Sequence, residues 1–461
     1  MGRCYYKVIV ASFLCIMTNY VMWPILGQMK ESGFQHLAKI PFLIAGAKGY
    51  HREASWYLRD RALLTWTPGN TQHNGKYPSR QSLSTYASSL VDFLDWCESA
   101  SRDWRSVEYT SDLVYGYQEQ MGSGLWSASG KPLSAQTINM RVGEAMRFLQ
   151  WSAARSLRKP FEAITVARKL SLPSHHHAGK HVQKEIEVRA GRVRPDPVTL
   201  RLPTNPEIAR WLKVVEIEKG LTKALMCDLI VQTAIRREEA CQWRVDTLSE
   251  YRKDWNINGD TVTVKLEYGT KGGKTTDENG DERGPSRHIT MPLAMAERLD
   301  KYRTNVRPTN RSKFVKANSS TPAERRELAK ANPRQLFLSD SNGLPIQAHT
   351  LYDAWTNVSY LPFEGWSPHG GRHYWACDTL LSSVRKTAAA LGSALNAGTS
   401  GNWITGCAND TMMMMIKPQL GHVSAATTEQ YLKWVLQASA QVDLNDGYQA
   451  ALDDDMGTVN G

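Results

Sequence analysis

The sequence predicts a mainly α-helical protein with a small antiparallel β-sheet, in which a helical domain precedes a larger domain that mixes helices and strands. Three observations support this fold class. Apolar residues recur at helical spacing over residues 80–155. An alternating segment around Val264, a glycine-rich turn and a second segment around Thr290 predict one hairpin. A basic stretch with several prolines separates the two regions, and a length of 461 residues is enough for two to three domains.

The helical region, residues 75–160, carries two apolar faces. Each face has residues at positions i, i+3, i+4 and i+7, which lie on one side of an α-helix. We expect Ser84 or Thr85 to cap the first helix. Packing in a core is sufficient to explain both faces, which are formed by Leu90, Phe93, Leu94 and Cys97 and by Val142, Ala145, Met146 and Leu149.

Residues 1–74 are expected to form a leader and a short arm. The segment Val8–Gly27 is apolar and follows basic residues, as a signal peptide or membrane anchor would. Polar residues and Pro24 interrupt it, however, and its apolar core is shorter than the roughly 20 residues that a membrane span needs. We therefore interpret it as a leader, with Met22 or Met29 as the actual start, and expect no stable membrane partner.

The charge of the chain favours a polyanionic partner. There are 56 Lys and Arg residues against 45 Asp and Glu, a formal net charge of +11, which suits DNA, RNA or an anionic membrane. Residues 161–205 are rich in Lys and Arg, and we expect them to form a basic linker. His175, His176 and His177 lie in it, but adjacent histidines cannot easily converge on one ion, so a solvated or phosphate-contacting loop is the better interpretation.

No cofactor and no metal are expected. The seven cysteines are an odd number, and no two have Cys-x-x-Cys spacing. This favours reduced thiols in a cytosolic protein over a zinc site or a disulfide framework. The sequence has no phosphate-binding loop of the GxxxxGK[ST] type, so nothing indicates ATP.

Two short segments carry basic residues suited to phosphate chemistry. Arg236 stands at a predicted helix start with Glu239 three residues on, and such a carboxylate can orient a guanidinium as a bidentate phosphate clamp. Lys271 lies in the turn Thr-Lys-Gly-Gly-Lys, where glycines let the backbone approach a ligand and a lysine can meet a phosphate or a leaving oxygen. Lys274 in the same turn is an alternative. Taken singly, the first segment is equally well explained as a surface ion pair and the second as an ordinary basic turn.

Two further segments add a second clamp and a nucleophile. His369 and Arg372 lie one helical turn apart and face the same way, which couples a proton-transfer group to a second guanidinium. His422 follows Leu-Gly, and Tyr431 comes nine residues later. A tyrosine hydroxyl can attack phosphorus where nearby cations favour its phenolate. By itself, Tyr431 would be a half-buried core tyrosine.

In this order, the segments TAIRREEA, TKGG, HGGRH and LGHVSAATTEQY resemble the tyrosine recombinase family, which includes phage integrases and the recombinases of integrative elements. The resemblance covers residues 206–445, the expected catalytic domain, and residues 75–160 resemble the family's helical, SAM-like core-binding domain. There are two departures. Ala234 stands where the family usually has Gly, and the segment between Arg372 and His422 looks inserted. Residues 446–461 are expected to form an acidic tail.

The resemblance implies a role for each candidate residue. Fixed cations would stabilise the charge that builds on the phosphate, without a metal. The phosphotyrosine bond would conserve energy, so that religation needs no ATP. The implied roles are grip on the scissile phosphate by Arg236 and Arg372, a hydrogen bond to a phosphate oxygen from His422, attack by Tyr431, proton transfer by His369, protonation of the leaving 5′ oxygen by Lys271, and bracing of Arg236 by Glu239.

The implied partners are double-stranded DNA attachment sites, further copies of the chain in a homotetramer on DNA, and accessory DNA-bending factors. The chain would then be a cytoplasmic, nucleoid-associated protein that integrates or excises a mobile element. Three alternatives stay open: a type IB topoisomerase, which shares this chemistry; a catalytically silent DNA-binding or architectural protein on the same scaffold; and a membrane-anchored protein, motivated only by residues 8–27. The separate helical domain favours recombination, and the intact catalytic set favours activity.

Overall fold

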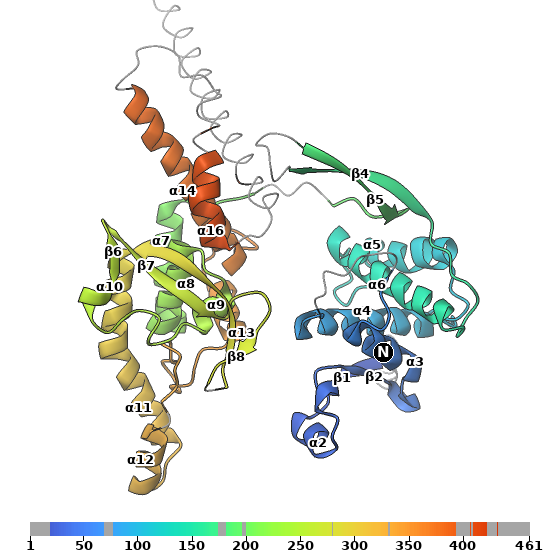
Figure 1. Ribbon diagram of the computed structural model, residues 1–461, viewed down its shortest axis with the longest axis horizontal. Coiled ribbons are helices and arrows are strands. Elements are labelled where there is room, and N and C mark those ends of the chain that lie inside the picture. Colours follow the sequence, from blue (N-terminus) through green and yellow to red (C-terminus); the bar gives the residue numbers. More distant parts are fainter. Residues whose placement is uncertain are drawn as a thin grey trace, which may run out of the picture. The chain divides into compact units, whose positions relative to one another are not determined.

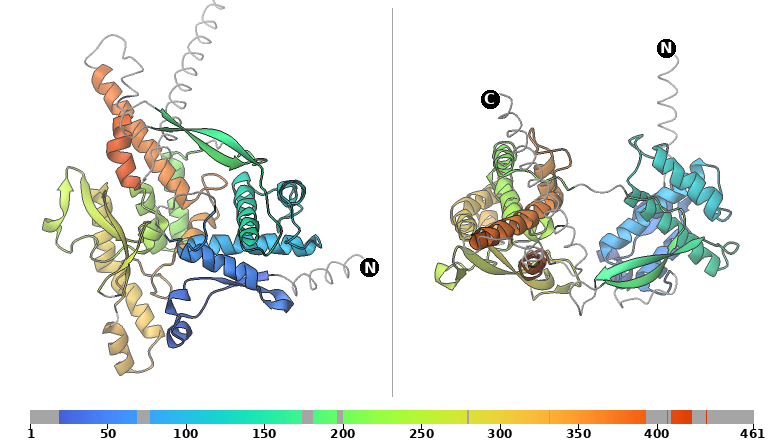
Figure 2. Two further views of the ribbon diagram at one scale, coloured as in Figure 1. Left: turned by 45° about the vertical axis from the view of Figure 1, so that its right-hand side comes forward. Right: turned by 90° about the horizontal axis from the view of Figure 1, so that it is seen from above.

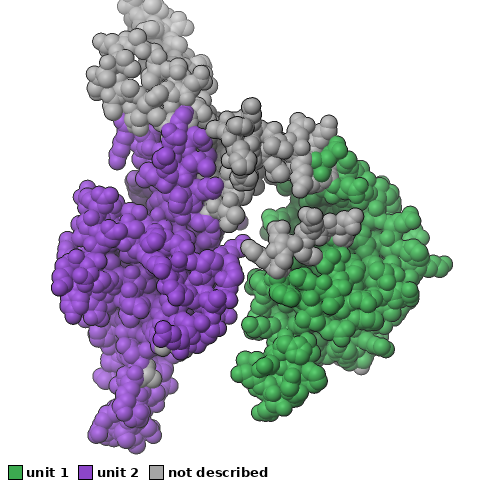
Figure 3. All heavy atoms as spheres, viewed as in Figure 1, with its two compact units in different colours: residues 1–198 green, residues 199–461 purple. Residues whose placement is uncertain are grey.

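The computed structural model describes residues 19–68, 77–173, 181–195, 200–278, 280–330, 332–392, 406, 409–421 and 431. The chain divides into two compact units, residues 1–198 and 199–461 (Figure 3). The division lies inside the range 161–205, where the sequence predicts a linker. In both units helices dominate, and the paired strands described are all antiparallel. This confirms the predicted fold class.

The described part of unit 1 begins with a small sheet and a helix packed on it. The strand order is β1–β2–β3, with Asn19 opposite Ala45 and Ile44 opposite Tyr50. The elements of this part are β1 (Asn19–Met22), α2 (Leu26–Glu31), η1 (Gln35–Leu37), β2 (Phe42–Ala45), η2 (Gly46–Lys48), β3 (Gly49–Tyr50) and α3 (Arg52–Leu63).

A bundle of helices follows in the same unit. Ser79 and Ser134 cap the two long helices, each accepting a hydrogen bond from a backbone N–H three residues on. The predicted cap at Ser84 or Thr85 is wrong, because α4 already begins at Arg80. The elements are α4 (Arg80–Ser99), η3 (Tyr109–Gln118), α5 (Glu119–Ser123) and α6 (Ala135–Ala154). Of the two predicted apolar faces, all eight residues but Met146 are buried, and Met146 packs against the same core.

The expected boundary between residues 74 and 75 does not separate two structural parts. Leu43 of β2 and Tyr57 and Leu58 of α3 are fully buried in the same hydrophobic core as the helices α4 and α6. A four-residue strand and a twelve-residue helix cannot bury their apolar sides alone, so they pack on the bundle. Strand β1 falls in the range expected to be a leader, and it pairs with β2.

The range predicted as a basic linker contains a long hairpin (Figure 2). Strands β4 (Thr165–Pro173) and β5 (His181–Arg189) pair from Thr165–Arg189 to Pro173–His181. The buried Arg189 anchors its base, since the guanidinium donates to the side-chain oxygens of Gln118 at 2.8 Å and of Asn139 at 2.7 Å. The three adjacent histidines, residues 175–177, lie outside the described residues.

Unit 2 combines helices with one four-stranded antiparallel sheet of order β6–β7–β9–β8 (Figure 1). Its first part comprises α7 (Asn205–Lys219), α8 (Leu221–Thr233), α9 (Arg237–Cys241), η4 (Arg252–Asp254), β6 (Asn256–Asn258), β7 (Thr261–Tyr268), β8 (Thr275–Thr276) and β9 (Glu282–Pro292). Its second part comprises α10 (Leu293–Lys301), η5 (Tyr302–Val306), α11 (Arg307–Ala317), α12 (Pro322–Lys330), α13 (Ala348–Thr356), α14 (Pro368–Gly392), η6 (Met412–Ile416) and α16 (Lys417–Leu420).

The predicted hairpin is the centre of this sheet. Val264 lies opposite Ile289 and Val262 opposite Met291, and these four side chains are buried. The register shifts between Leu266 and Tyr268, just before the glycine-rich turn. A bulge of this kind bends a strand and redirects the chain beyond it. The turn that carries Lys271 therefore leaves the sheet at an irregular point.

Helix α14 extends well past the predicted catalytic pair. The segment that looks inserted begins, in the structure, as a continuation of this helix to Gly392, and residues 393–405 lie outside the described residues. Within the described part of the chain, no helix is both long enough and apolar enough to cross a membrane. No group of three or more His, Cys, Asp or Glu side chains there could hold a metal ion.

Candidate active site

Arg236 sits in the short connection between α8 and α9. Its backbone N–H donates to Glu239 Oε2 at 2.6 Å, and its Nη1 donates to Glu239 Oε1 at 3.1 Å. Glu239 therefore completes the start of α9 and fixes the guanidinium at the same time. Arg236 keeps about a quarter of its side chain exposed, at 26%. The expected pairing of these two residues is present.

Glu239 is fully buried, at 0% exposure, and it bridges two arginines. Arg287 of β9 donates to it from Nη2 at 2.7 Å and from Nε at 3.2 Å. Burial opposes ionisation of Glu239, but the charges and hydrogen bonds of Arg287 and Arg236 outweigh it and hold the pKa of this carboxyl below its usual range. The carboxylate is consequently ionised at neutral pH, and both guanidinium groups are braced by one group.

Arg372 approaches the same place from the first turn of α14. Its Nη1 donates to the carbonyl of Ala234 and its Nη2 to the carbonyl of Leu420 at 2.9 Å. The residue is 4% exposed. Burial and, after it, the positive charge of Arg236 lower the pKa of Arg372 to about 10, although Glu239 opposes this shift. The group still carries its charge at neutral pH.

The two guanidinium groups meet at one turn, residues 419–421. Arg236 Nη2 donates to the carbonyl of Gly421 at 3.1 Å, next to the Leu420 carbonyl that Arg372 binds. The amide of Gln419 ties this turn to the sheet: its Oε1 accepts from Thr290 N–H at 2.9 Å, and its Nε2 donates to Thr290 O at 2.8 Å. Residues as far as 185 positions apart in the sequence thus form one cationic centre.

The start of α14 packs closely against the core, and this packing keeps Arg372 buried. The helix begins with Pro-His-Gly-Gly-Arg, and a Cβ at Gly371 would lie 2.7 Å from the Trp355 ring. Trp355 belongs to a buried tryptophan cluster with Trp211, whose ring centroid is 4.5 Å away. A larger residue at 371 would push the helix away from the core. The glycine between the predicted catalytic pair therefore has a structural reason.

His369 lies one turn before Arg372, as predicted from the spacing. It occupies an exposed position on α14, yet the surrounding protein removes enough water to lower the pKa of the imidazole, and the charges of Arg372 and Arg236 lower it further. At neutral pH the ring is therefore neutral. This suits a group that accepts a proton near a negatively charged phosphate.

Tyr431 is buried at 2% exposure in a small apolar cluster with Ala234, Cys377 and Leu420. Its hydroxyl oxygen lies 2.8 Å from Nδ1 of His373. Burial raises the pKa of Tyr431 to about 12, with an opposing effect from the charge of Arg372. The phenol is consequently protonated at neutral pH and must lose its proton to act as a nucleophile.

His373 and Arg287 are two site residues that the sequence reasoning missed. His373 stands one helical turn after His369, and their ring centroids are 4.3 Å apart. The i, i+4 spacing was a usable signal for it. Arg287 gave no such signal, because its partner Glu239 is 48 residues away in the sequence.

Lys271 lies on the exposed turn between β7 and β8, where it forms no ion pair with any described residue. Lys274, the alternative, pairs with Glu282 at 2.6 Å. The start of the turn lies against α9: Gly269 has φ 72°, and a Cβ there would be 2.5 Å from the backbone oxygen of Glu238. Only glycine permits this approach without strain, so the turn leaves the sheet directly beside the Arg236–Glu239 pair.

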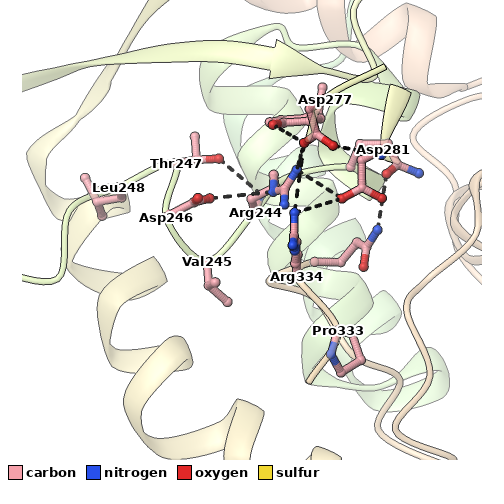
Figure 4. Close-up of polar contacts among 12 residues, drawn as sticks. Arg244, Val245, Asp246, Thr247, Leu248, Asp277, Asp281, Pro333 and Arg334 are labelled. Atoms are coloured by element: carbon pink, nitrogen blue, oxygen red, sulfur yellow. Dashed lines mark hydrogen bonds and ion pairs between the residues drawn. The ribbon is translucent and has the colours of Figure 1, made fainter. Parts of the chain in front are cut away.

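Four charged residues hold the far end of this turn (Figure 4). Arg244 Nη1 lies 3.4 Å from Asp277 Oδ2 and 3.3 Å from Asp281 Oδ2. Arg334 Nη1 lies 3.4 Å from the same atom of Asp281. Tyr268, at the end of β7, donates its hydroxyl to Asp277 at 3.0 Å. We define these four charged residues as the turn anchor, which fixes the chain on the far side of Lys271 while the lysine itself stays exposed.

The structure thus brings together Arg236, Glu239, Arg372, His369 and Tyr431, and it places Lys271 on a turn that begins beside Glu239. His422 lies outside the described residues, although Gly421 immediately before it contacts Arg236. Segments far apart in the sequence supply these groups. Two fixed cations, a neutral imidazole and a buried phenol in one place can bind a phosphate and attack it.

Comparison with solved structures finds similar chains among tyrosine recombinases. The XerH site-specific recombinase bound to palindromic difH substrate matches with 15% identity and a TM-score of 0.45, over 79% of this chain and 80% of that one. The Tn1549 transposon integrase in complex with circular intermediate DNA matches with 14% identity and a TM-score of 0.41, over 82% and 94%. A lambda integrase dimer bound to a COC′ core site matches with 13% identity and a TM-score of 0.40, over 82% and 94%.

No family model and no curated relative matches the sequence. All three structural matches have TM-scores below 0.5. The assignment of activity to this chain therefore rests on its own residues and on the geometry described above.

Proposed function

We propose that this chain is a site-specific DNA recombinase that cleaves and rejoins DNA through a 3′-phosphotyrosine bond at Tyr431. The observation that carries the proposal is the convergence of Arg236 and Arg372 on the turn 419–421, with the Tyr431 hydroxyl in the adjoining cluster. A single surface arginine would not support it. Two guanidinium groups that donate to one turn, with Arg236 braced by Glu239, form a site for the trigonal-bipyramidal transition state of attack on a phosphodiester, in which negative charge builds on the phosphate oxygens.

In the proposed reaction the Tyr431 oxygen bonds to phosphorus and the 5′ oxygen of the next nucleotide leaves. The phosphate would take over guanidinium N–H groups that now donate to the backbone carbonyls of residues 234, 420 and 421. Lys271 protonates the leaving oxygen, His369 takes part in proton transfer, and His422 donates to a phosphate oxygen. Because the phosphotyrosine stores the bond energy, attack by a 5′ hydroxyl reverses the step without ATP.

The remaining parts of the proposal concern DNA and assembly. Unit 1 would contact the duplex as a core-binding domain, with attachment-site DNA as the partner, and the net charge of +11 supports a polyanionic ligand. Exchange of two duplexes requires four strand cuts and one tyrosine per cut, which supports a homotetramer on DNA. Accessory DNA-bending factors, integration or excision of a mobile element, and a place at the nucleoid belong to the same proposal.

The activity can be tested without knowing the target sequence. The full chain is incubated with a pool of nicked duplexes of random sequence, the mixture is denatured, and covalently attached DNA is recovered and sequenced. We expect a recurrent sequence from the wild type and no adduct from Tyr431→Phe, which should bind DNA nearly as well because phosphate contacts are spread over the protein. An adduct with the Phe variant would refute the role of Tyr431.

The same protein and DNA distinguish the proposed recombinase from a type IB topoisomerase and from a catalytically silent DNA-binding protein. A type IB topoisomerase would relax supercoiled plasmid that lacks the recovered sequence, and it would do so without pairing two sites. A silent DNA-binding protein would retain duplexes on a filter but would form no adduct. The proposed recombinase forms adducts on the recovered sequence and exchanges strands between two copies of it.

A further inference from the structure

The Tyr431 hydroxyl has a described neighbour that can hold a proton. His373 Nδ1 lies 2.8 Å from the hydroxyl oxygen, within ordinary hydrogen-bond distance, and the two ring centroids are 5.4 Å apart. His373 is half-buried in the second turn of α14, so the helix that carries Arg372 also carries this imidazole. The contact joins residues 58 apart in the sequence.

Two other described groups near the hydroxyl, Arg372 and Cys377, are poorly suited to take its proton. Arg372 is cationic and has no acceptor atom. Cys377 is a buried thiol, and burial raises the pKa of Cys377 to about 12. His369 has its ring beside that of His373 and carries the influence of both Arg372 and Arg236. The histidine whose hydrogen bond to the Tyr431 hydroxyl is described is His373.

The phenol can supply the proton of this hydrogen bond. Burial raises the pKa of Tyr431 to about 12, so the hydroxyl carries its proton at neutral pH. In the tautomer with its ring hydrogen on Nε2, a neutral His373 accepts this hydrogen bond at Nδ1. That tautomer is the one that can take up the proton as the tyrosine oxygen attacks.

We propose that His373 is a further catalytic residue, which orients the Tyr431 hydroxyl and accepts its proton during attack on the scissile phosphate. The inference rests on the proposed function. As the Tyr431 oxygen bonds to phosphorus, the O–H bond breaks and the proton passes to Nδ1, giving an imidazolium. The bond from phosphorus to the 5′ oxygen breaks, and that oxygen takes a proton from Lys271. In religation His373 returns its proton to the tyrosine as the phosphotyrosine bond breaks.

Chemical rescue tests the proton transfer on the full chain. His373→Ala is assayed for covalent adduct formation on the duplex recovered from the random pool, with and without added imidazole. We expect a rate about 10²- to 10⁴-fold below wild type, the range of a general base, and partial recovery that rises with imidazole concentration and with the basicity of methylated imidazoles. Circular dichroism and DNA band shifts show whether the variant is folded and binds DNA.

His373→Asn is the matched control, because its side-chain oxygen can accept the hydrogen bond near the position of Nδ1 but cannot take up a proton. We expect this variant to fold and bind DNA while cleaving as slowly as His373→Ala. A second pair of chains carries a fluorinated, more acidic tyrosine at position 431, with either the native histidine or the His373→Asn change. The more acidic phenol should reduce the rate difference between the two chains of this pair.

The possible results are distinct. Absence of a wild-type adduct overturns the proposed function and this inference together. A wild-type adduct combined with full activity of His373→Asn overturns proton transfer by His373 and leaves the proposed function intact. Slow cleavage by His373→Ala that no imidazole improves, in a folded chain, also contradicts it. Rescue graded by imidazole basicity supports it.

Discussion

The arginine centre and the Lys271 turn are built in opposite ways, although both serve the same proposed reaction. Glu239 and the carbonyl of Gly421 hold Arg236, and the carbonyls of Ala234 and Leu420 hold the buried Arg372, whereas the Lys271 side chain is exposed on its turn. Groups that stabilise charge on the phosphate act best when they are fixed in advance. A group that must deliver a proton to a departing oxygen can instead extend from an exposed position on a turn.

The largest expected effect on stability comes from removing the brace of the arginine centre. Glu239→Ala would leave two guanidinium groups without their carboxylate, and breaking a buried ion pair in this way costs about 3–5 kcal/mol of unfolding free energy. Cleavage should fall by about 10²–10³-fold, comparable to the loss of one preorganised group. Denaturant unfolding of the full chain and adduct formation measure the two effects. A variant with wild-type stability would show that Glu239 is dispensable.

Glu239 also predicts a pH dependence. Its folded-state pKa lies below the unfolded value, so its contribution to stability is present above the unfolded pKa and is lost as pH falls through the folded pKa. The unfolding free energy of the wild type should therefore drop below roughly pH 4.3, the ordinary glutamate value. Glu239→Gln should show a smaller drop over that range. Parallel curves for the two chains would argue against this assignment.

Removal of Lys271 should affect chemistry and leave the fold unchanged. We expect Lys271→Ala to lower cleavage by about 10²–10⁴-fold, as for loss of a general acid, with unaltered stability because the side chain is exposed. A substrate with sulfur in place of the leaving 5′ oxygen needs no protonation and should restore the rate. Lys274→Ala is the matched control, since Lys274 is engaged by Glu282. If Lys274→Ala, and not Lys271→Ala, slows cleavage and is rescued by the sulfur substrate, then Lys274 is the residue that protonates the leaving oxygen.

The turn anchor should produce an intermediate effect. Arg244→Met removes the cation between Asp277 and Asp281, so the turn anchor is weakened. We expect about a tenfold slower cleavage, partly restored by the sulfur substrate, and a stability loss of about 1–3 kcal/mol, because the largely buried Asp277 carboxylate loses its cation. The double variant with Asp277→Asn should be less affected than the sum of the single variants. Additive effects would show that Arg244 and Asp277 act separately.

The smallest effect is expected at Ala234, on the arginine side of the comparison. This residue has φ 53°, a left-handed conformation that costs an ordinary residue about 1 kcal/mol relative to glycine. Its methyl group is fully buried, and burial of one methyl contributes about 0.8 kcal/mol. Ala234→Gly should therefore change the unfolding free energy by less than about 0.5 kcal/mol. A larger change in the unfolding free energy would show that either the backbone cost of the left-handed conformation or the burial of the methyl group dominates.

Local patterns predicted much of the fold. The apolar faces of α4 and α6 and the alternation around Val264 were visible because each element buries its own periodic face. The β4–β5 hairpin and the packing of residues 19–68 onto the helices α4 and α6 were missed. A basic, proline-containing segment looked like a linker although it alternates as a strand, and the shared core of Leu43 and Tyr57 depends on contacts between distant segments.

In the candidate site, too, local pairs could be predicted from the sequence and contacts between distant segments could not. Arg236 with Glu239, and His369 with Arg372, could be paired from the sequence because each pair lies within one helical turn. Arg287 and Gln419 take their roles from residues far away in the sequence, and no spacing rule reaches across 48 or 129 residues. The spacing to His369 could have drawn attention to His373, but its contact with Tyr431 joins residues 58 apart. The functional interpretation came from the resemblance of four segments in order, and the geometry supplied the contacts between them.

The most direct test of the proposed chemistry is to identify the residue that becomes bonded to DNA. Adducts from the nicked-duplex assay are digested with protease and nuclease, and the nucleotide-bearing peptide is sequenced by mass spectrometry. We predict a 3′-linked nucleotide on the hydroxyl of Tyr431, found in the wild type and absent from Tyr431→Phe. A nucleotide attached to any other residue, or linked through its 5′ phosphate, would contradict the proposal.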